Sequence, residues 1–258
     1  FCGMVFSPTH LSLLKDGPDG RRRFVDSAYC QLRPGYIASV AEFHKILAQR
    51  NAFLKQMQDG IPTDPAMLEI WNHSLAAAGA RLTVARQHYI NRLQPIAQEI
   101  YAGLSGGREV LSLAWQSPVW IPSAPPAEIA ARWMDALNEA TRADRAAGFT
   151  TVGPHREDLT ILLDGNPARV YGSQGQQKSF LIALKLAEYT LLARATGEKP
   201  MLLLDDLFDK LDMRRVAQLL RLVSGEIFGQ IMITDCNKHR LQRTLDEAGA
   251  DYRLFHIS

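Results

Sequence analysis

From Gly148 to the last residue, short apolar runs alternate with segments of helical period, and this alternation constrains the fold more than any other feature. The runs that we expect to form strands are 158–163, 168–171, 201–204, 230–234 and 252–257. The segments with apolar residues at helical spacing are 177–195, 213–224 and 238–248. Strands that alternate with helices run parallel and are covered on both faces, so the pattern predicts an α/β fold. Between the first two runs, Asp164-Gly165-Asn166-Pro167 predicts a β-hairpin turn.

The residues before Gly148 have a different character, because helical spacing dominates there. Helices are expected at 22–58 with a break near Pro34, at 67–104, and at 128–147 with an end at Gly148. Met4-Val5-Phe6 reads as a strand, and because the chain opens inside it we expect that upstream sequence is missing. The chain therefore divides into a short opening piece (1–21), a mostly helical insert (22–148) and a core (149–258).

Composition excludes several classes of protein. The chain is 47% hydrophobic and 22% charged, which is typical of globular proteins, and it has no apolar run long enough for a transmembrane helix. Cys2, Cys30 and Cys236 are far apart and lack metal-ligand spacing, so we expect buried thiols in a reducing, cytoplasmic compartment. The net charge of +2 does not indicate nucleic-acid binding, which depends on local basic clusters.

The run Met201-Leu-Leu-Leu204 ends in two adjacent carboxylates, Asp205 and Asp206. Ligands of α/β sheets bind at the carboxyl ends of strands, and this pattern resembles the Walker B motif of P-loop ATPases. The resemblance implies that Asp205 holds Mg²⁺ and that Asp206 orients or deprotonates the attacking water. Many relatives have Glu at the second position, so slow hydrolysis is expected. For the hexapeptide alone, two acids capping a turn is the alternative.

Upstream, Gly172-Ser173-Gln174-Gly175-Gln176 opens a helix, where outward-facing N–H groups suit an anion. The segment resembles the signature loop of ATP-binding-cassette ATPases. That resemblance implies that Ser173, Gly175 and Gln176 face the ATP bound by the other subunit of a dimer. The alternative is an ordinary Ser-Gly-Gln helix cap.

Two further positions match the same class of ATPase. Asp212 occupies the terminal acid of the D-loop that contacts the partner subunit, although Asp209 stands where Ser is common. Thr234 and Asp235 end the last core strand, where such ATPases place a side chain that senses the γ-phosphate. These roles follow from the resemblance and not from spacing.

Three longer segments resemble the RecF family: 152–159 (Val-Gly-Pro-His-Arg-Glu-Asp-Leu), 6–26 with Gly17-Pro18-Asp19-Gly-Arg-Arg-Arg-Phe, and 49–55 (Gln-Arg-Asn-Ala-Phe-Leu-Lys). The resemblance implies the C-terminal part of a P-loop NTPase head of ABC/SMC type, with 22–148 as a helical arm. It further implies ATP and Mg²⁺ as cofactors, ATP-dependent homodimerisation, binding to DNA at single-stranded/double-stranded junctions, and loading of recombinase at gaps with RecO and RecR.

No Gly-x-x-x-x-Gly-Lys-Ser/Thr loop occurs in the 258 residues. In the family this loop lies near the N-terminus, so truncation is the expected explanation. These residues alone should then neither bind ATP tightly nor hydrolyse it.

The densest basic cluster is Arg21-Arg22-Arg23, which with Arg50 and Lys55 is a candidate for DNA phosphate contact. A solvated helix start is the alternative. His155-Arg156 is open between a structural turn and a nucleotide contact. Two other functions also stay open: another SMC-like ATPase head, and a DNA-binding scaffold without catalysis.

Overall fold

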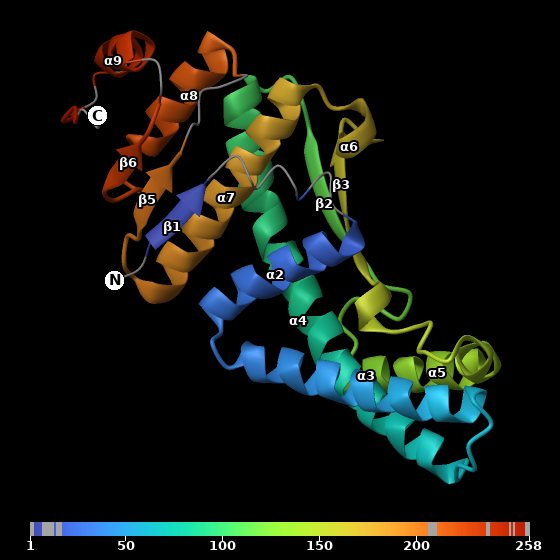
Figure 1. The fold of residues 1–258 in the computed structure, drawn as a ribbon. Coiled ribbons are helices and arrows are strands. Elements are labelled where there is room, and N and C mark those ends of the chain that lie inside the picture. Colours follow the sequence, from blue (N-terminus) through green and yellow to red (C-terminus); the bar gives the residue numbers. More distant parts are fainter. Residues whose placement is uncertain are drawn as a thin grey trace. The chain divides into compact units, whose positions relative to one another are not determined.

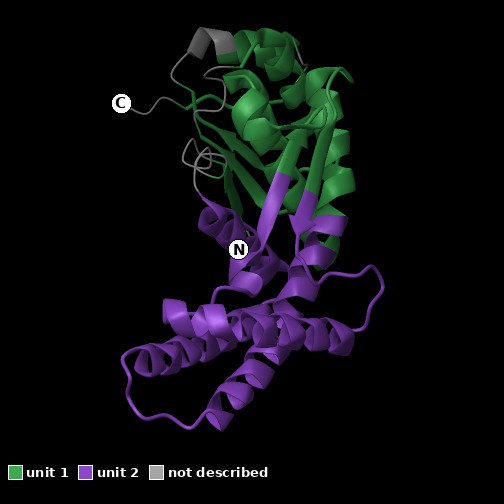
Figure 2. Cartoon of the chain, turned by 90° about the vertical axis from the view of Figure 1, so that its right-hand side faces the viewer, with its two compact units in different colours: residues 1–15, 92–113, 161–258 green, residues 16–91, 114–160 purple. Residues whose placement is uncertain are grey.

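The computed structural model describes residues 3–6, 13, 17–205, 211–235, 238–247, 249 and 251–255 (Figure 1). Its contacts divide the chain into two compact units. Unit 1 contains 1–15, 92–113 and 161–258, and unit 2 contains 16–91 and 114–160 (Figure 2). The sequence-based boundaries after residues 21 and 148 remain predictions.

Unit 1 contains a parallel sheet of three short strands. These are β1 (Gly3–Phe6), β5 (Met201–Leu204) and β6 (Ile231–Ile233), in the order β1-β5-β6. Met4 pairs with Leu202, and Leu203 pairs with Met232. The strands expected at residues 4–6, 201–204 and 230–234 are confirmed, as is their parallel direction.

Helix α7 (Gln174–Thr196) packs against β1 (Figure 1). Nearly every side chain from 178 to 192 is buried, which is why this helix lacks a clear polar face. It ends at Gly197, whose φ of 72° is the left-handed conformation favoured by glycine. Helices α8 (Met213–Val223) and α9 (Lys238–Glu247) also match their predicted segments and contact each other.

Unit 2 is built on helices α2 (Pro18–Leu32), α3 (Tyr36–Gln58) and α5 (Pro126–Ala147). Their apolar faces share a core with residues of α4 (Ala66–Ser105). The largest fully buried members of this core are Phe43, Leu75, Leu82, Trp133 and Leu137. The predicted break at Pro34 and the predicted end at Gly148, with φ 73°, are both confirmed.

Helix α4 spans 40 residues and contributes to both units. A second sheet has the order β2-β3-β4 and consists of β2 (Leu111–Gln116), β3 (Asp158–Leu163) and β4 (Asn166–Pro167). No described helix has the length and hydropathy needed to cross a membrane.

Two predicted strands are wrong. Residues 168–171 form the short helix α6 (Ala168–Tyr171), because Pro167 has no N–H with which to continue the ladder beyond the tight turn at Asp164 and Gly165. Of the strand expected at 252–257, residues 252–255 are not in a strand, and 256–257 lie outside the described residues. There Phe255 is 78% exposed, so no sheet face is available to bury it.

Candidate functional site

Asp205 and Thr234 meet at the carboxyl end of the parallel sheet. The backbone N–H of Asp205 donates to the Phe6 carbonyl at 2.9 Å, so the residue continues the pairing of β5 with β1. The Thr234 N–H donates to the Leu204 carbonyl at 2.9 Å, and its hydroxyl donates to Oδ1 of Asp205 at 2.5 Å. The structure therefore brings together two side chains that lie 29 positions apart in the sequence.

The Asp205 carboxylate is exposed and takes a hydrogen bond from a neutral hydroxyl, which leaves its charge available to a cation. Mg²⁺ usually takes one or two protein carboxylates and completes its octahedron with waters and phosphate oxygens. Within the described residues no three His, Cys, Asp or Glu side chains cluster. Asp206 and the loop 207–210 lie outside the described residues. Asp235 is half-buried beside Thr234.

Ser173 is the N-cap of α7 and forms a capping box with Gln176. The Gln176 N–H donates to the Ser173 hydroxyl at 3.3 Å, and the Ser173 N–H donates to the Gln176 side chain at 2.8 Å. The hydroxyl of Ser173 is exposed and, because it accepts from Gln176, can direct its own proton toward an anion. The Gly175 carbonyl is occupied inside the helix by Ser179 at 2.8 Å.

Sequence reasoning missed the residues that fix this loop. Gln177 donates through Nε2 to the Gly172 carbonyl at 2.8 Å. A Cβ on Gly172 would lie 2.6 Å from the Ala168 carbonyl oxygen, so only glycine fits at this close approach. A Gln at a helix start reads as an exposed polar residue, and nothing in the sequence distinguishes it from one that anchors a loop.

Asp212 is the N-cap of α8, and its side chain accepts from the Arg215 N–H at 2.9 Å. The Arg215 guanidinium reaches Glu109 at 2.7 Å, and Glu109 also accepts from the Tyr101 hydroxyl at 2.5 Å. This network holds the start of α8 within unit 1. A contact of Asp212 with a partner subunit stays a prediction.

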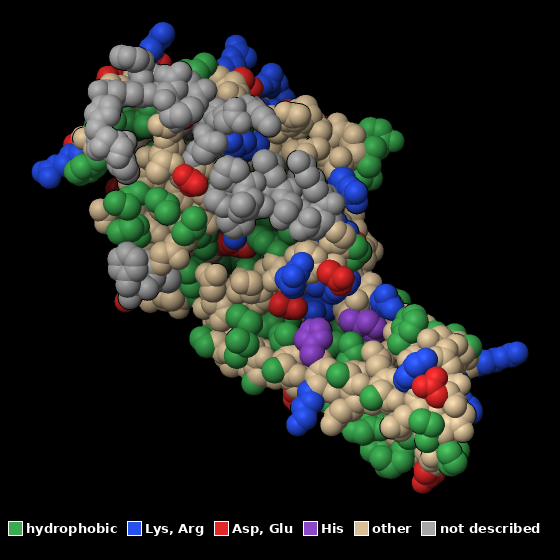
Figure 3. Space-filling model, viewed as in Figure 1, with side chains coloured by type: hydrophobic (Ala, Val, Ile, Leu, Met, Phe, Trp, Pro, Cys, Tyr) green, Lys and Arg blue, Asp and Glu red, His purple; other side chains and the backbone are tan. Residues whose placement is uncertain are grey.

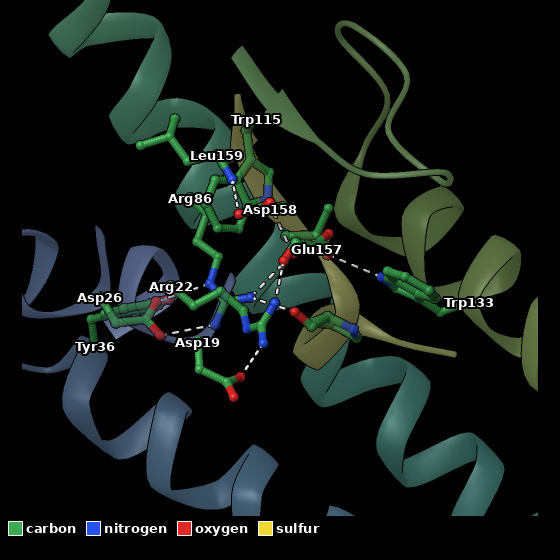
Figure 4. Close-up of polar contacts among 12 residues, drawn as sticks. Asp19, Arg22, Asp26, Tyr36, Arg86, Trp115, Trp133, Glu157, Asp158 and Leu159 are labelled. Carbon is green, nitrogen blue, oxygen red and sulfur yellow. Dashed lines mark hydrogen bonds and ion pairs between the residues drawn. The ribbon is translucent and has the colours of Figure 1, made fainter. Parts of the chain in front are cut away.

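In unit 2, the segment 153–158 contributes Glu157 to a buried network of charged side chains (Figure 4). Arg86 pairs with Asp26 through two hydrogen bonds of 2.9 and 2.8 Å, and with Glu157 at 3.1 Å. Glu157 also accepts from Thr83 at 2.7 Å and from the Trp115 ring N–H at 3.1 Å. Each buried charge is thus paired and hydrogen-bonded, which is the condition for keeping charges in an interior.

Two of the three arginines predicted to contact DNA bind residues next to this network. Arg21 makes two hydrogen bonds of 2.7 Å to Asp158. Arg22 donates to the Glu157 carbonyl and pairs with Asp19, whereas Arg23 is exposed. DNA contact by the cluster remains a prediction.

Arg50 and Lys55, the two further candidates for DNA contact, differ in burial. Arg50 is fully buried, with Nη1 at 2.7 Å from both Asp144 and Thr150, so it presents no surface to a phosphate. Lys55 is exposed and pairs with Asp59 at 3.1 Å.

His155 and Arg156 have separate environments. The Nε2 of His155 lies 3.1 Å from the Thr150 carbonyl, and its Nδ1 is buried without a hydrogen-bond partner among the described residues. Burial, reinforced by the positive charges of Arg156 and Arg22, lowers the pKa of His155 to about 4. The exposed Arg156 lies over the Phe149 ring at 5.8 Å.

A carboxylate at the end of a parallel strand, a neighbouring threonine and a serine-capped helix in the same unit agree with the core that the sequence resemblance implies, that of an ATP-binding-cassette type of ATPase head. No protein-family model matches the chain. The DNA replication and repair protein RecF of Bacteroides thetaiotaomicron is 37% identical over 98% of the chain, and that of Flavobacterium johnsoniae is 34% identical over 98%. The chain spans 66% of the length of the first relative and 68% of the second.

Among solved structures, the recombination mediator protein RecF with ATPrS in the RecFOR pathway has a TM-score of 0.81 and 30% identity. This match covers 92% of the chain and 63% of that structure. The chain belongs to the RecF family.

Proposed function

We propose that this protein is a DNA repair and replication ATPase and that these residues supply part of its nucleotide site. The observation that carries the proposal is the Thr234–Asp205 hydrogen bond of 2.5 Å at the carboxyl end of the parallel sheet. It presents an exposed carboxylate where an α/β fold binds its ligand. The names of the relatives, and a relative solved with an ATP analogue, support the same function.

In this proposal, ATP supplies the phosphoanhydride bond that is cleaved. Asp205 holds Mg²⁺, and the Thr234 hydroxyl fixes the rotamer of that carboxylate. Asp206, in the next position, orients the attacking water, and its short side chain makes hydrolysis slow. Ser173 donates to phosphate oxygens from the positive end of the α7 dipole, together with the backbone N–H groups of the first turn.

Ser173 acts on the ATP bound by the second subunit, so ATP joins two copies of the protein. The dimer then encloses DNA at single-stranded/double-stranded junctions, and hydrolysis releases it. The RecFOR pathway of the solved relative supports RecO and RecR as further partners.

The test uses analytical ultracentrifugation to measure ATP-dependent dimerisation of the full-length protein on gapped DNA. Ser173→Arg places a bulky cation at the cap and should keep the protein monomeric in ATP. Ser224→Arg is the matched control, because Ser224 is an exposed cap residue of α8 in the same unit. Dimerisation of wild type and Ser224→Arg, but not of Ser173→Arg, supports the proposal. If wild-type protein does not respond to ATP, the chain is a scaffold without catalysis, and the roles of Asp205 and Asp206 are wrong.

A further inference from the structure

Three exposed arginines surround a hollow in unit 1 that the nucleotide site does not use. The hollow has a volume of about 460 Å³. It is lined by Gly106, Arg108, Arg214, Ala217, Gln218 and Arg221. All six residues belong to unit 1. Figure 3 shows Lys and Arg side chains projecting separately from the edge of this unit near α8, with Asp and Glu side chains between them.

The backbone of the hollow is shaped by the end of α4. Gly106 and Gly107 have φ of 68° and 72°, and the Gly107 N–H donates to the Ala102 carbonyl at 2.8 Å to close the helix. With its amide nitrogen turned toward α4, Gln218 donates to the carbonyls of Leu104 at 2.5 Å and Gly103 at 3.2 Å. These contacts fix α8 against the turn, so the floor of the hollow is rigid.

The charge in the hollow is of one sign. None of the lining residues is acidic, and within the described part of the chain Arg214 and Arg221 form no ion pair. Two acids of the described residues, Glu109 and Asp212, both pair with Arg215, at 2.7 and 3.5 Å. Arg108 uses its Nε to donate to the Ser105 carbonyl at 3.0 Å, and its side chain is exposed. Three like charges without acidic partners repel each other unless an anion joins them.

The spacing along α8 suits a chain of phosphates. Arg214 and Arg221 are seven residues apart, which corresponds to two turns on one helix face and a rise of about 10.5 Å. Both side chains therefore lie on the same side of α8, where they can contact different phosphates of one backbone strand. Arginine forks also match phosphate oxygens in geometry.

We propose that Arg108, Arg214 and Arg221 form a contact site for the nucleic-acid backbone. The inference rests on the proposed function, since it assumes a DNA-bound protein, and it locates phosphate contacts at a place that sequence reasoning did not select. Of the sequence candidates Arg21, Arg22 and Arg23, the first two have guanidinium groups engaged by Asp158 and by the Glu157 carbonyl, and Arg23 is exposed. Among the described residues, Arg214 and Arg221 form no ion pair and are exposed.

The test compares salt-dependent binding of a gapped duplex by full-length variants in the presence of ATP. Arg214→Gln/Arg221→Gln should weaken binding about tenfold and reduce the slope of log affinity against log salt by about 0.9 for each lost contact. Arg194→Gln/Arg253→Gln removes the same charge from exposed arginines that do not line the hollow and should bind as wild type. Thermal unfolding verifies that all variants are folded.

The possible outcomes separate this site from the general function. If wild-type protein binds the duplex and Arg214→Gln/Arg221→Gln binds equally well with an unchanged salt slope, the site is wrong and the proposed function stands. If both double variants weaken binding equally, only net charge matters and the site is wrong. If the hollow variant instead loses binding to a polyglutamate peptide, the surface takes an acidic protein. If wild-type protein does not bind DNA, both proposals fail.

Discussion

At the scale of single residues, His155 is a buried imidazole kept neutral by its surroundings. Its Nε2 lies 3.1 Å from the Thr150 carbonyl, which can only accept a hydrogen bond, so Nε2 carries the hydrogen and Nδ1 carries none. Protonating Nδ1 would place a charge in a buried site that also contains the positive charges of Arg156 and Arg22. Asp144 is the acid that opposes this effect, and it is already paired with Arg50 at 2.7 Å.

A pH dependence of stability follows from this site. The folded pKa of about 4 lies below the ordinary value of 6.5, so the unfolded chain binds the proton more readily. The contribution of the neutral imidazole to the free energy of unfolding is fully present above pH 6.5. It is lost as pH falls from 6.5 toward 4. Between pH 7.5 and pH 5, wild-type protein should lose about 2 kcal/mol more unfolding free energy than His155→Gln. Urea unfolding at the two pH values measures this difference.

The control for this prediction is His88→Gln, because His88 is exposed on α4. This variant should follow the wild-type pH dependence. If wild-type protein and His155→Gln lose the same unfolding free energy between the two pH values, His155 is protonated without cost. The interpretation of His155 as a buried, neutral imidazole would then be wrong.

Some contacts of the charged residues could be predicted from the sequence, and others could not. Asp205 and Thr234 could be selected because both follow apolar runs, and strand ends of a parallel sheet share one edge. The partners of Arg21 and Arg22 could not be found, since Asp158 lies 137 positions away from Arg21. Whether an arginine faces solvent or a buried acid is decided by packing between distant segments.

At the scale of elements, the helix boundaries were predictable where glycine or proline interrupts the period. Pro34 separates α2 from α3, and Gly148 ends α5. The segment 168–171 was not predictable from its apolar residues, because Val170 and Tyr171 are each 70% exposed and do not face a core. A hydrophobic pattern predicts an element only where tertiary packing buries it.

The loop before α7 provides a prediction about an element. In Gly172→Ala, the new Cβ would lie 2.6 Å from the Ala168 carbonyl oxygen, so the backbone must shift and displace Ser173. The backbone at Gly172 has φ −73° and ψ 129°, which alanine adopts freely, so the effect is purely steric. ATP-dependent dimerisation of the full-length protein should weaken about tenfold, corresponding to roughly 1.4 kcal/mol. Sedimentation at several ATP concentrations measures it.

Gly103→Ala is the matched control, because Gly103 lies inside α4 and the added methyl carbon would have no neighbour within 4 Å. It should dimerise as wild type and gain up to about 1 kcal/mol of stability. Dimerisation of Gly172→Ala at wild-type ATP concentrations would show that the loop tolerates displacement, and that Ser173 does not depend on its present position.

At the scale of the whole molecule, the proposed ATPase has two composite sites, each using Asp205 of one subunit and Ser173 of the other. This arrangement can be tested by mixing two inactive variants, Asp205→Asn and Ser173→Arg. In a mixed dimer, one site carries both changes and the other carries neither. The intact site arises only if the two residues act from different subunits.

Each mixed dimer has one intact site of two, so the mixture should recover ATP turnover up to about half of the wild-type value, the limit reached when all subunits form mixed dimers. The ATP turnover of each variant alone should remain near background at the same total concentration. An equal mixture of Asp205→Asn with Asp205→Asn/Ser173→Arg is the control, because its dimers contain no intact site. Steady-state phosphate release on gapped DNA measures all four samples. If the mixture of single variants stays at background while its subunits still exchange, Ser173 and Asp205 serve the same bound nucleotide within one chain, and ATP cannot be the bridge that joins the two copies.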